Sequence, residues 1–328
     1  MKTDLSRAAF VKSAAATALM GVAPSLAQTG DAPMINRIRI ATLNSPDMKS
    51  VADWYVKWFE YRVTETGKVD AALAQSWGTP KMAGAPFTLL ASTGSPDVFL
   101  RVIQGSPAPA FNPRGTFGWG SLEFIVADLD GIYKKFKAGG IGIFREPASL
   151  GGIFASIHAM QIFGPMNMTH NLSVETGNAA TSNLPTAKSR VDRMFLVGLN
   201  GPSLKDLSAF YANMFKMTKG ADFEYPNPVL SEAMGLAKDH LFKLGLVRSA
   251  QKGNTIELHD LPNGAPRPQL EGELPPGVGM VSFGVADLNA LNLPYLGAPA
   301  VRSSAAYQGR RAATLKGPAG ELIELIEE

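Results

Sequence analysis

The feature that most constrains this chain is an internal repeat. Residues 37–55 match residues 193–211 at six of nineteen positions without a gap, at an offset of 156 residues. A shorter match joins FIVADLD, which begins at Phe124, to FGVADLN, which begins at Phe283, at an offset of 159. Repeats of this kind mark copies of one supersecondary unit that stack on one another. The chain is therefore expected to contain four similar units, two in each half.

Each unit is expected to follow the order strand, helix, strand, strand, strand. Apolar residues recur at helical spacing at Val51, Trp54, Tyr55, Trp58 and Phe59, and again at Leu207, Phe210, Tyr211, Met214 and Phe215. Such a stripe predicts a helix that lies with one face on a sheet. Strands are expected at 62–69, 86–91, 98–104, 142–146, 154–163, 168–174, 240–247, 254–259, 300–303, 310–316 and 321–326, with extra helical turns at 71–77 and 229–238. The predicted fold class is α+β, with four βαβββ units.

The sequence also suggests how these units are grouped. Proline-rich connectors at 105–115 and 261–276 join the units within each half, and the polar stretch 176–189 joins the two halves. We therefore expect an N-terminal domain at 34–175 and a C-terminal domain at 190–328, each made of two units.

Composition excludes several classes of protein. The 328 residues are 45% apolar and 18% charged, which is typical of a folded globular chain rather than a disordered one. The absence of cysteine excludes disulfides, thiolate metal sites and cysteine nucleophiles. A formal charge of +3 is too small to indicate a nucleic-acid partner. The body of the chain has no apolar run long enough for a membrane span, so no span is expected there. The expected partner is a small molecule, and the oligomeric state is left open.

The first 27 residues resemble an export signal. Lys2, Arg7 and Lys12 precede a small-residue and apolar stretch, and residues 25–27 form a small-x-small cleavage site before Gln28. Residues 6–12 are similar to a twin-arginine signal in which Ala8 replaces the second arginine, so export by that route or by Sec is expected. Residues 28–33 would then form a linker, and the location would be the periplasm. An ordinary amphipathic N-terminal helix is the alternative.

The tandem units, the V-x-D-L turn and the final-strand pattern of GNTIEL resemble the vicinal oxygen chelate superfamily, which includes glyoxalases, extradiol dioxygenases and bleomycin-resistance proteins. This resemblance implies that paired units curl their sheets into a cup. It also implies a metal held in the cup by a residue of a first strand and a glutamate of a last strand. Carried onto this chain, the first-strand positions are Arg37, Ser121, Arg193 and Met280, and the last-strand positions are Arg101, Asn171, Glu257 and Glu324.

The expected N-terminal cup is rich in arginine. Strand alternation would line it with Arg37, Arg39, Arg101, Ser121, Glu123, Thr169 and Asn171. A guanidinium binds a carboxylate through several donors and offers no lone pair to a metal, so an anionic ligand is expected here, gripped between Arg37 and Arg101. The alternative is that these arginines pair with Glu123 or point to solvent.

The expected C-terminal cup is lined by Arg193, Phe195, Glu257, His259, Met280, Ser282 and Glu324. Glu257, His259 and Glu324 would supply two carboxylates and one imidazole, a possible ligand set for a divalent metal. Alternatively, Arg193 neutralises Glu257 and Glu324. No cofactor is expected in the favoured interpretation, and a divalent metal at this cup is the alternative.

Histidine and aromatic residues supply the remaining candidates and their alternatives. His158 is expected to face the N-terminal cup and to act with Glu123 as acid or base, because histidine titrates near neutral pH. Trp119, with Trp77 and Phe111, is a candidate wall for a flat ligand, although core packing is the alternative. His170 is expected to be a packed structural residue, and His240 is expected to have no special role.

Two classes of function are consistent with these residues. The first is a periplasmic, metal-independent lyase or isomerase that acts on a small anionic molecule, which could carry an aromatic ring. The second is a non-catalytic protein that binds or sequesters a small molecule. A metal-dependent dioxygenase or glyoxalase-like lyase that uses the C-terminal cup is a further enzyme alternative.

Overall fold

The computed structural model describes residues 32–328, and the expected export signal at 1–27 lies outside the described residues. All four expected units are present. The first unit contains β1 (Ile35–Ser45), α1 (Met48–Phe59), β2 (Arg62–Lys68), α2 (Ala71–Ser76), the short 3₁₀ helix η1 (Pro80–Met82), β3 (Pro86–Ala91) and β4 (Phe99–Gln104). The second contains β5 (Gly118–Val126), α3 (Leu129–Ala138), β6 (Ile143–Ser149), η2 (Gly152–Phe154), β7 (Ile157–Phe163), η3 (Pro165–Asn167) and β8 (Thr169–Glu175).

The second half repeats this order with longer insertions. The third unit contains β9 (Val191–Gly201), α4 (Leu204–Met214), β10 (Thr218–Lys219), β11 (Phe223–Pro226), α5 (Pro228–Ala233), β12 (Leu241–Arg248) and β13 (Thr255–Asp260). The fourth contains β14 (Gly277–Val285), α6 (Leu288–Leu291), β15 (Ala300–Val301), β16 (Arg311–Lys316) and β17 (Leu322–Glu327). Residues 37–55 and 193–211, which match in sequence, both form a strand followed by a helix.

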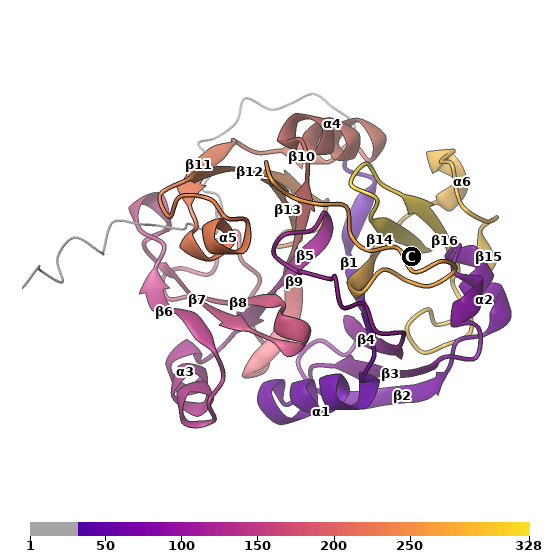
Figure 1. Cartoon of the computed structure of the whole chain (residues 1–328), viewed down its shortest axis with the longest axis horizontal. Helices are drawn as coiled ribbons and strands as arrows, with labels where there is room; N and C mark the ends of the chain where they lie inside the picture. The colour runs from indigo at the N-terminus through magenta and orange to yellow at the C-terminus, as the bar shows by residue number, and fades with distance from the viewer. Residues whose placement is uncertain (1–31) are drawn as a thin grey trace, which may run out of the picture.

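The units pair across the two halves of the sequence. One sheet has the order β15-β16-β17-β14-β1-β4-β3-β2, so it joins the fourth unit to the first. The other has the order β10-β12-β13-β9-β5-β8-β7-β6, with β11 beside β12, so it joins the third unit to the second. We call the concave side of the first sheet the outer cup and that of the second sheet the inner cup. Figure 1 shows the two curled sheets side by side.

This pairing corrects the expected grouping of 34–175 against 190–328, because neither half closes a sheet by itself. The first strands of the units meet in antiparallel pairs, β1 with β14 and β5 with β9. Each first strand can in principle pair with the first strand of any other unit, since all four carry the same local pattern. Which first strands pair depends on packing between segments that are far apart in the sequence. The residue pattern within one unit does not predict that packing.

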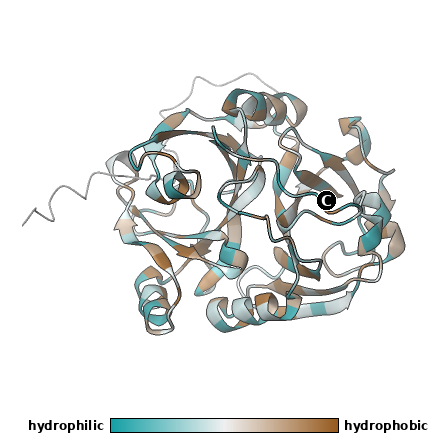
Figure 2. Cartoon of the chain, viewed as in Figure 1, coloured by the Kyte–Doolittle hydropathy of each residue, from teal (hydrophilic) through white to brown (hydrophobic). Residues whose placement is uncertain are grey.

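Helices α1, α3, α4 and α6 pack into one core on the convex sides of the sheets, whereas α2 and α5 border the outer and inner cups. Helix α1 begins where the Asp47 side chain accepts a hydrogen bond from the backbone N–H of Ser50, and its buried face includes Tyr55 and Phe59. Tyr55 and Phe59 belong to one apolar cluster that also contains Phe124 of β5 and Phe283 of β14, so it reaches both sheets. In Figure 2 apolar residues recur along the strands, and the peripheral helices interleave them with hydrophilic residues. A second apolar cluster lies on the concave side of the first sheet, in the outer cup, and includes Ile40, Met280 and Ile326.

Within residues 32–328, no helix combines the length and the apolar character that a membrane crossing requires.

Candidate functional site

The inner cup contains a small polar cavity of about 50 Å³. This volume has room for a few water molecules. Helix α5 lies in the opening of this cup, as Figure 1 shows, and contributes Val229 and Leu230 to the lining. The other lining residues are Pro113, Arg114, Gly120, Ser121, Phe144, Gln161, Thr169, Asn171, Asn200, Tyr225, Asn227, Glu257 and His259.

A chain of three buried side chains forms the most reactive part of this lining. The Nε2 atom of His259 lies 2.8 Å from Oε1 of Glu257, and its Nδ1 atom lies 3.0 Å from the hydroxyl of Tyr225. These partners assign the proton of a neutral imidazole to Nε2, with the Tyr225 hydroxyl donating to Nδ1. The other carboxylate oxygen of Glu257, Oε2, is buried and has no hydrogen-bond partner among the described residues. An acceptor in this position is available to take a proton from a bound molecule.

Glu123 lies beneath the cavity rather than in its wall. Its carboxylate accepts a 2.6 Å hydrogen bond from the hydroxyl of Ser173 and a 3.5 Å hydrogen bond from the amide of Asn171. Asn171 also accepts a 3.0 Å hydrogen bond from Gln161, and both amides line the cavity. Burial, together with the nearby charge of Glu257, raises the pKa of Glu123 to about 8. Near neutral pH Glu123 is therefore mostly protonated. Its hydrogen bond with Asn171 connects it to the lining of the cavity.

Gly198 creates the space next to these groups. Its backbone lies between Ser121 on β5 and Glu257 on β13 in one row of the sheet. A Cβ atom at this position would lie 2.1 Å from the hydroxyl oxygen of Ser121 and 3.6 Å from Nε2 of His259. The cavity therefore depends on the missing side chain of Gly198.

One cation reaches this cavity from the connector between the first and second units. Arg114 donates a 2.8 Å hydrogen bond to the carbonyl of Asn167, and its guanidinium carbon lies 4.8 Å from the ring centroid of Phe163. The sequence interpretation missed Arg114, Gln161, Asn200 and Tyr225. Arg114 follows Pro113 in a connector that the sequence marked as proline-rich, and that was the only available signal for it.

The outer cup holds a different set of groups around Glu324. This carboxylate accepts hydrogen bonds of 2.8 Å from Trp77, 2.8 Å from Tyr307 and 2.5 Å from Ser282, and Arg101 lies 3.5 Å away. Arg101 also donates to Thr42 and to the Tyr307 hydroxyl, and only 2% of its surface is exposed. The guanidinium of Arg101 thus neutralises Glu324 at the base of the cup.

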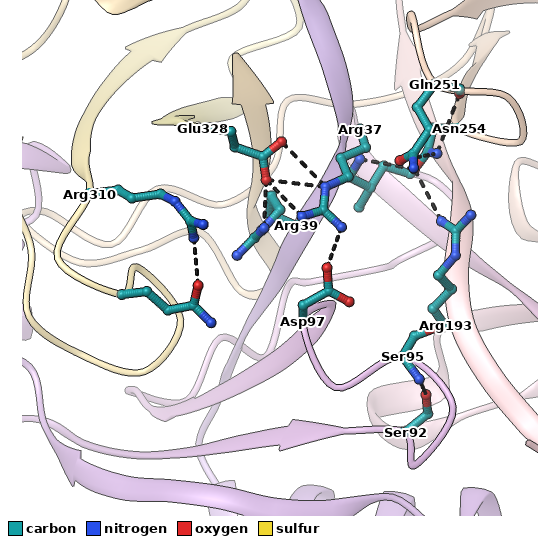
Figure 3. Close-up of polar contacts among 12 residues, drawn as sticks. Arg37, Arg39, Ser92, Ser95, Asp97, Arg193, Gln251, Asn254, Arg310 and Glu328 are labelled. Carbon is teal, nitrogen blue, oxygen red and sulfur yellow. Dashed lines mark hydrogen bonds and ion pairs between the residues drawn. The ribbon is translucent and has the colours of Figure 1, made fainter. Parts of the chain in front are cut away.

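The remaining arginines do not form the expected carboxylate grip. Arg37 is paired with Asp97 and with Glu328, at 2.9 Å, and Arg39 with the same Glu328 at 2.5 Å. Figure 3 shows both guanidinium groups turned toward these acids. Because Arg101 lies with Glu324 instead, the prediction that Arg37 and Arg101 hold one ligand from two sides is wrong.

The N-terminal and C-terminal cups expected from the sequence are each divided between the two sheets. Ser121, Glu123, Thr169 and Asn171 are brought together as predicted, but in the inner cup with Glu257 and His259. Glu324 and Arg101 lie in the outer cup. Arg193 donates to Asn254 at 3.3 Å and neutralises neither glutamate. The expected grouping of these residues into an N-terminal and a C-terminal cup is wrong because it assumed that each half of the sequence forms its own cup.

The structure also places four aromatic or histidine residues that the sequence had singled out. His158 pairs with Val174 across β7 and β8, one residue out of phase with the cup-facing Ser173, so its side chain lies on the opposite face and cannot act in the cup as predicted. Trp119 is 1% exposed and donates a 2.8 Å hydrogen bond to the carbonyl of Leu322. It is therefore a core residue, the alternative to its role as a wall for a ligand. His170 is buried against Tyr55, as expected for a packed residue. His240 packs edge-on against Phe242.

Neither cup fits a resident metal. The expected ligands Glu257, His259 and Glu324 are split between the two sheets. In the outer cup the cationic Arg101 occupies the position beside Glu324, and in the inner cup both ring nitrogens of His259 already have partners. Among residues 32–328, no three histidine, aspartate or glutamate side chains converge as metal ligands.

No family model and no curated protein matches this chain in sequence. Solved structures do match. A mutant of glyoxalase I from Zea mays superposes with a TM-score of 0.60 at 15% identity, covering 89% of this chain and 92% of that one. A candidate dioxygenase from Bacillus subtilis superposes with a TM-score of 0.57 at 13% identity, covering 91% of this chain and 86% of that one. Together with the four βαβββ units and the two curled sheets, these matches show that the chain has the vicinal oxygen chelate fold.

Proposed function

We propose that this protein is a metal-independent lyase or isomerase that moves a proton on a small anionic molecule bound in the inner cup. The observation that carries the proposal is the buried, unpartnered Oε2 of Glu257, whose other oxygen is held by His259. A carboxylate fixed on one side and free on the other is a suitable general base. His259, held in turn by Tyr225, orients Glu257 and stabilises its charge.

Arg114 supports the anionic character of the ligand. Arg114 lines the cavity and its buried Nε atom has no hydrogen-bond partner among residues 32–328, although Glu232 is near enough to act on its charge. A guanidinium binds a carboxylate through two parallel hydrogen bonds, so a carboxylate at the cavity mouth would place the adjacent carbon toward Glu257. Asn171 and Gln161 supply amide donors and acceptors for the rest of the molecule. Movement of α5 would enlarge the cavity for a ligand of this size.

The test is hydrogen exchange at carbon. The protein is incubated in deuterium oxide with 2-oxo and 2-hydroxy acids, with and without an aromatic ring, and loss of C–H signal is followed by NMR. We expect exchange for at least one acid, reduced by about 10² to 10⁴ in Glu257→Gln. Glu224→Gln, an exposed change on β11, is the matched control and should leave the rate unchanged.

Binding of these acids without exchange would contradict the enzyme proposal and favour the non-catalytic binding protein. A rate that rises with added divalent metal and falls with a chelator would favour the metal-dependent alternative. The periplasmic location is a separate part of the proposal, supported by the sequence of residues 1–27. Cell fractionation and N-terminal sequencing test it, and a mature protein that begins at Gln28 is the expected result.

A further inference from the structure

The outer cup has an opening of its own, apart from the inner cup. A cavity of about 260 Å³ lies between β2, α2 and the loop after β15. An apolar protein cavity of about 150 Å³ is large enough to hold benzene. The cavity of the outer cup therefore has room for a six-membered ring with a small substituent.

Arg302 is the group in this cavity that lacks a partner. It lines the cavity, only 9% of its surface is exposed, and its buried Nε atom has no hydrogen-bond partner among the described residues. A cationic side chain that is nine-tenths buried without an ion-pair partner is costly. An anion that enters the cavity would supply the missing charge and the hydrogen-bond acceptors.

The other charged groups of the lining are already engaged or lie at the rim. Glu65 accepts a 2.7 Å hydrogen bond from the backbone of Ala305, and Asp70 accepts one of 2.7 Å from the backbone of Leu73. Arg101 is held by Glu324, and Lys68 is exposed at the edge of β2. Arg302 is therefore the cation that an entering anion would meet.

The walls of this cavity favour a flat ring. Trp77, Phe87 and Tyr307 line it, and the guanidinium carbon of Arg101 lies 4.7 Å from the Trp77 ring centroid and 5.4 Å from that of Tyr307. Trp77, Tyr307 and Arg101 have almost no exposed surface, so an aromatic ligand would pack against this aromatic floor and Phe87 rather than stack on an open ring face. From the cavity, the unpartnered Arg302 and these walls, we propose that the outer cup is a second binding site, specific for a small aromatic carboxylate.

The probe is benzoate, titrated into the full protein by calorimetry and by tryptophan fluorescence. Trp77 lines the cavity, whereas Trp54, Trp58 and Trp119 do not, so binding should change the emission of Trp77. We expect saturable binding of benzoate that is at least tenfold tighter than binding of acetate or inorganic phosphate. Equal affinity for acetate or phosphate, or no saturable binding of benzoate, would overturn the proposal.

Substitutions locate the site. Arg302→Met removes every donor while keeping much of the side-chain bulk, and we expect it to weaken benzoate binding at least tenfold, with partial recovery in Arg302→Lys. Arg310→Met is the matched control, because Arg310 lies on the same loop, contacts Gln308 and does not line the cavity. Its affinity should equal that of the unmodified protein.

Two further variants separate this site from the inner cup. Glu257→Gln and Arg114→Met should leave benzoate affinity unchanged, even if the proposed proton transfer is absent. Loss of benzoate binding in Arg114→Met, with normal binding in Arg302→Met, would place the ligand in the inner cup and overturn the inference. Thermal unfolding of each variant confirms that the comparison is made between folded proteins.

Discussion

At the scale of single residues, the space beside Ser121 is set by Gly198. Adding one methyl group there places a Cβ atom 2.1 Å from the Ser121 hydroxyl oxygen. We expect Gly198→Ala to lower the free energy of unfolding by about 1 to 3 kcal/mol, as overpacking in a close-packed site does. Ser121→Ala removes the hydroxyl oxygen involved, so the double variant should recover most of that loss. Denaturant unfolding of the two single variants and the double variant measures this, and strictly additive losses would contradict the contact.

Glu123 gives a second residue-scale prediction, for pH. Its pKa in the folded protein is about 8, above the ordinary value of 4.5, because burial disfavours the charged carboxylate. The folded state therefore holds a proton that the unfolded state releases, and this stabilising contribution is lost as pH rises through 8. Glu123→Gln, which does not titrate, should show a smaller fall in unfolding free energy than the unmodified protein between pH 6 and 9. Parallel curves for the two proteins would contradict this assignment.

Residue positions were predictable where the strand register was regular. Glu257 and Asn171 face the inner cup, as the last-strand patterns indicated. Among the first-strand positions, Ser121 faces the inner cup as indicated, and Met280 and Ser282 both face the outer cup, where Ser282 contacts Glu324. Arg37 instead pairs with Asp97 and Glu328. Register shifts interrupt the pairing of β1 with β14, and the apolar pattern alone does not locate such irregularities.

At the scale of secondary-structure elements, one hydrogen bond ties α1 of the first unit to β8 of the second. The Tyr55 hydroxyl lies 2.6 Å from Nε2 of the fully buried His170, and burial lowers the pKa of this histidine to about 4. Tyr55→Phe leaves Nε2 buried without a partner, which costs about 1 to 3 kcal/mol. We expect that loss in denaturant unfolding, and a smaller additional loss when Tyr55→Phe is made in a His170→Phe background. Equal losses in both backgrounds would show that the two residues are not coupled.

Elements with a clear period were predictable from the sequence. Strand β3 has the expected bounds, and β2, β4 and β16 differ from theirs by one residue. The apolar stripe of α1 is buried at Val51, Tyr55 and Phe59, as its spacing indicated. The two-residue strand β10 is too short to give a period of its own, and its pairing with β12 defines it. Strand β15, Ala300–Val301, lies within the expected strand at 300–303 and pairs with β16.

At the scale of the whole molecule, the crossed pairing of the units predicts how a divided chain behaves. A cut between Ala179 and Ala180, both exposed in the segment between β8 and β9, leaves each fragment with unpaired first strands. Exposed strand edges of this kind promote association. We expect residues 32–179 and 180–328 to form a 1:1 complex when co-expressed, and to aggregate or self-associate when made separately. Co-purification and size-exclusion chromatography measure this, and a monomeric, cooperatively unfolding half would contradict it.

The number of units and the fold were predictable because each unit repeats one local pattern. The pairing between units was not, since it depends on contacts such as that of Ile40 with Ser282, between strands at opposite ends of the sequence. Because the pairing between units was not predictable, the candidate site was only partly identified. Several of its residues were recognised one by one, but they were grouped into the wrong cups.

The nested order of the two sheets also has a consequence for the growing chain on the ribosome. The inner sheet can close once β13 has emerged, because all its strands lie between residues 118 and 260. The first unit is made earliest, yet β1 must wait for β14, which is synthesised near the end. During that interval β1 presents an open edge, and pairing across so long a loop is slow. We therefore expect the first unit of the nascent chain to need protection by a chaperone for longer than the later units.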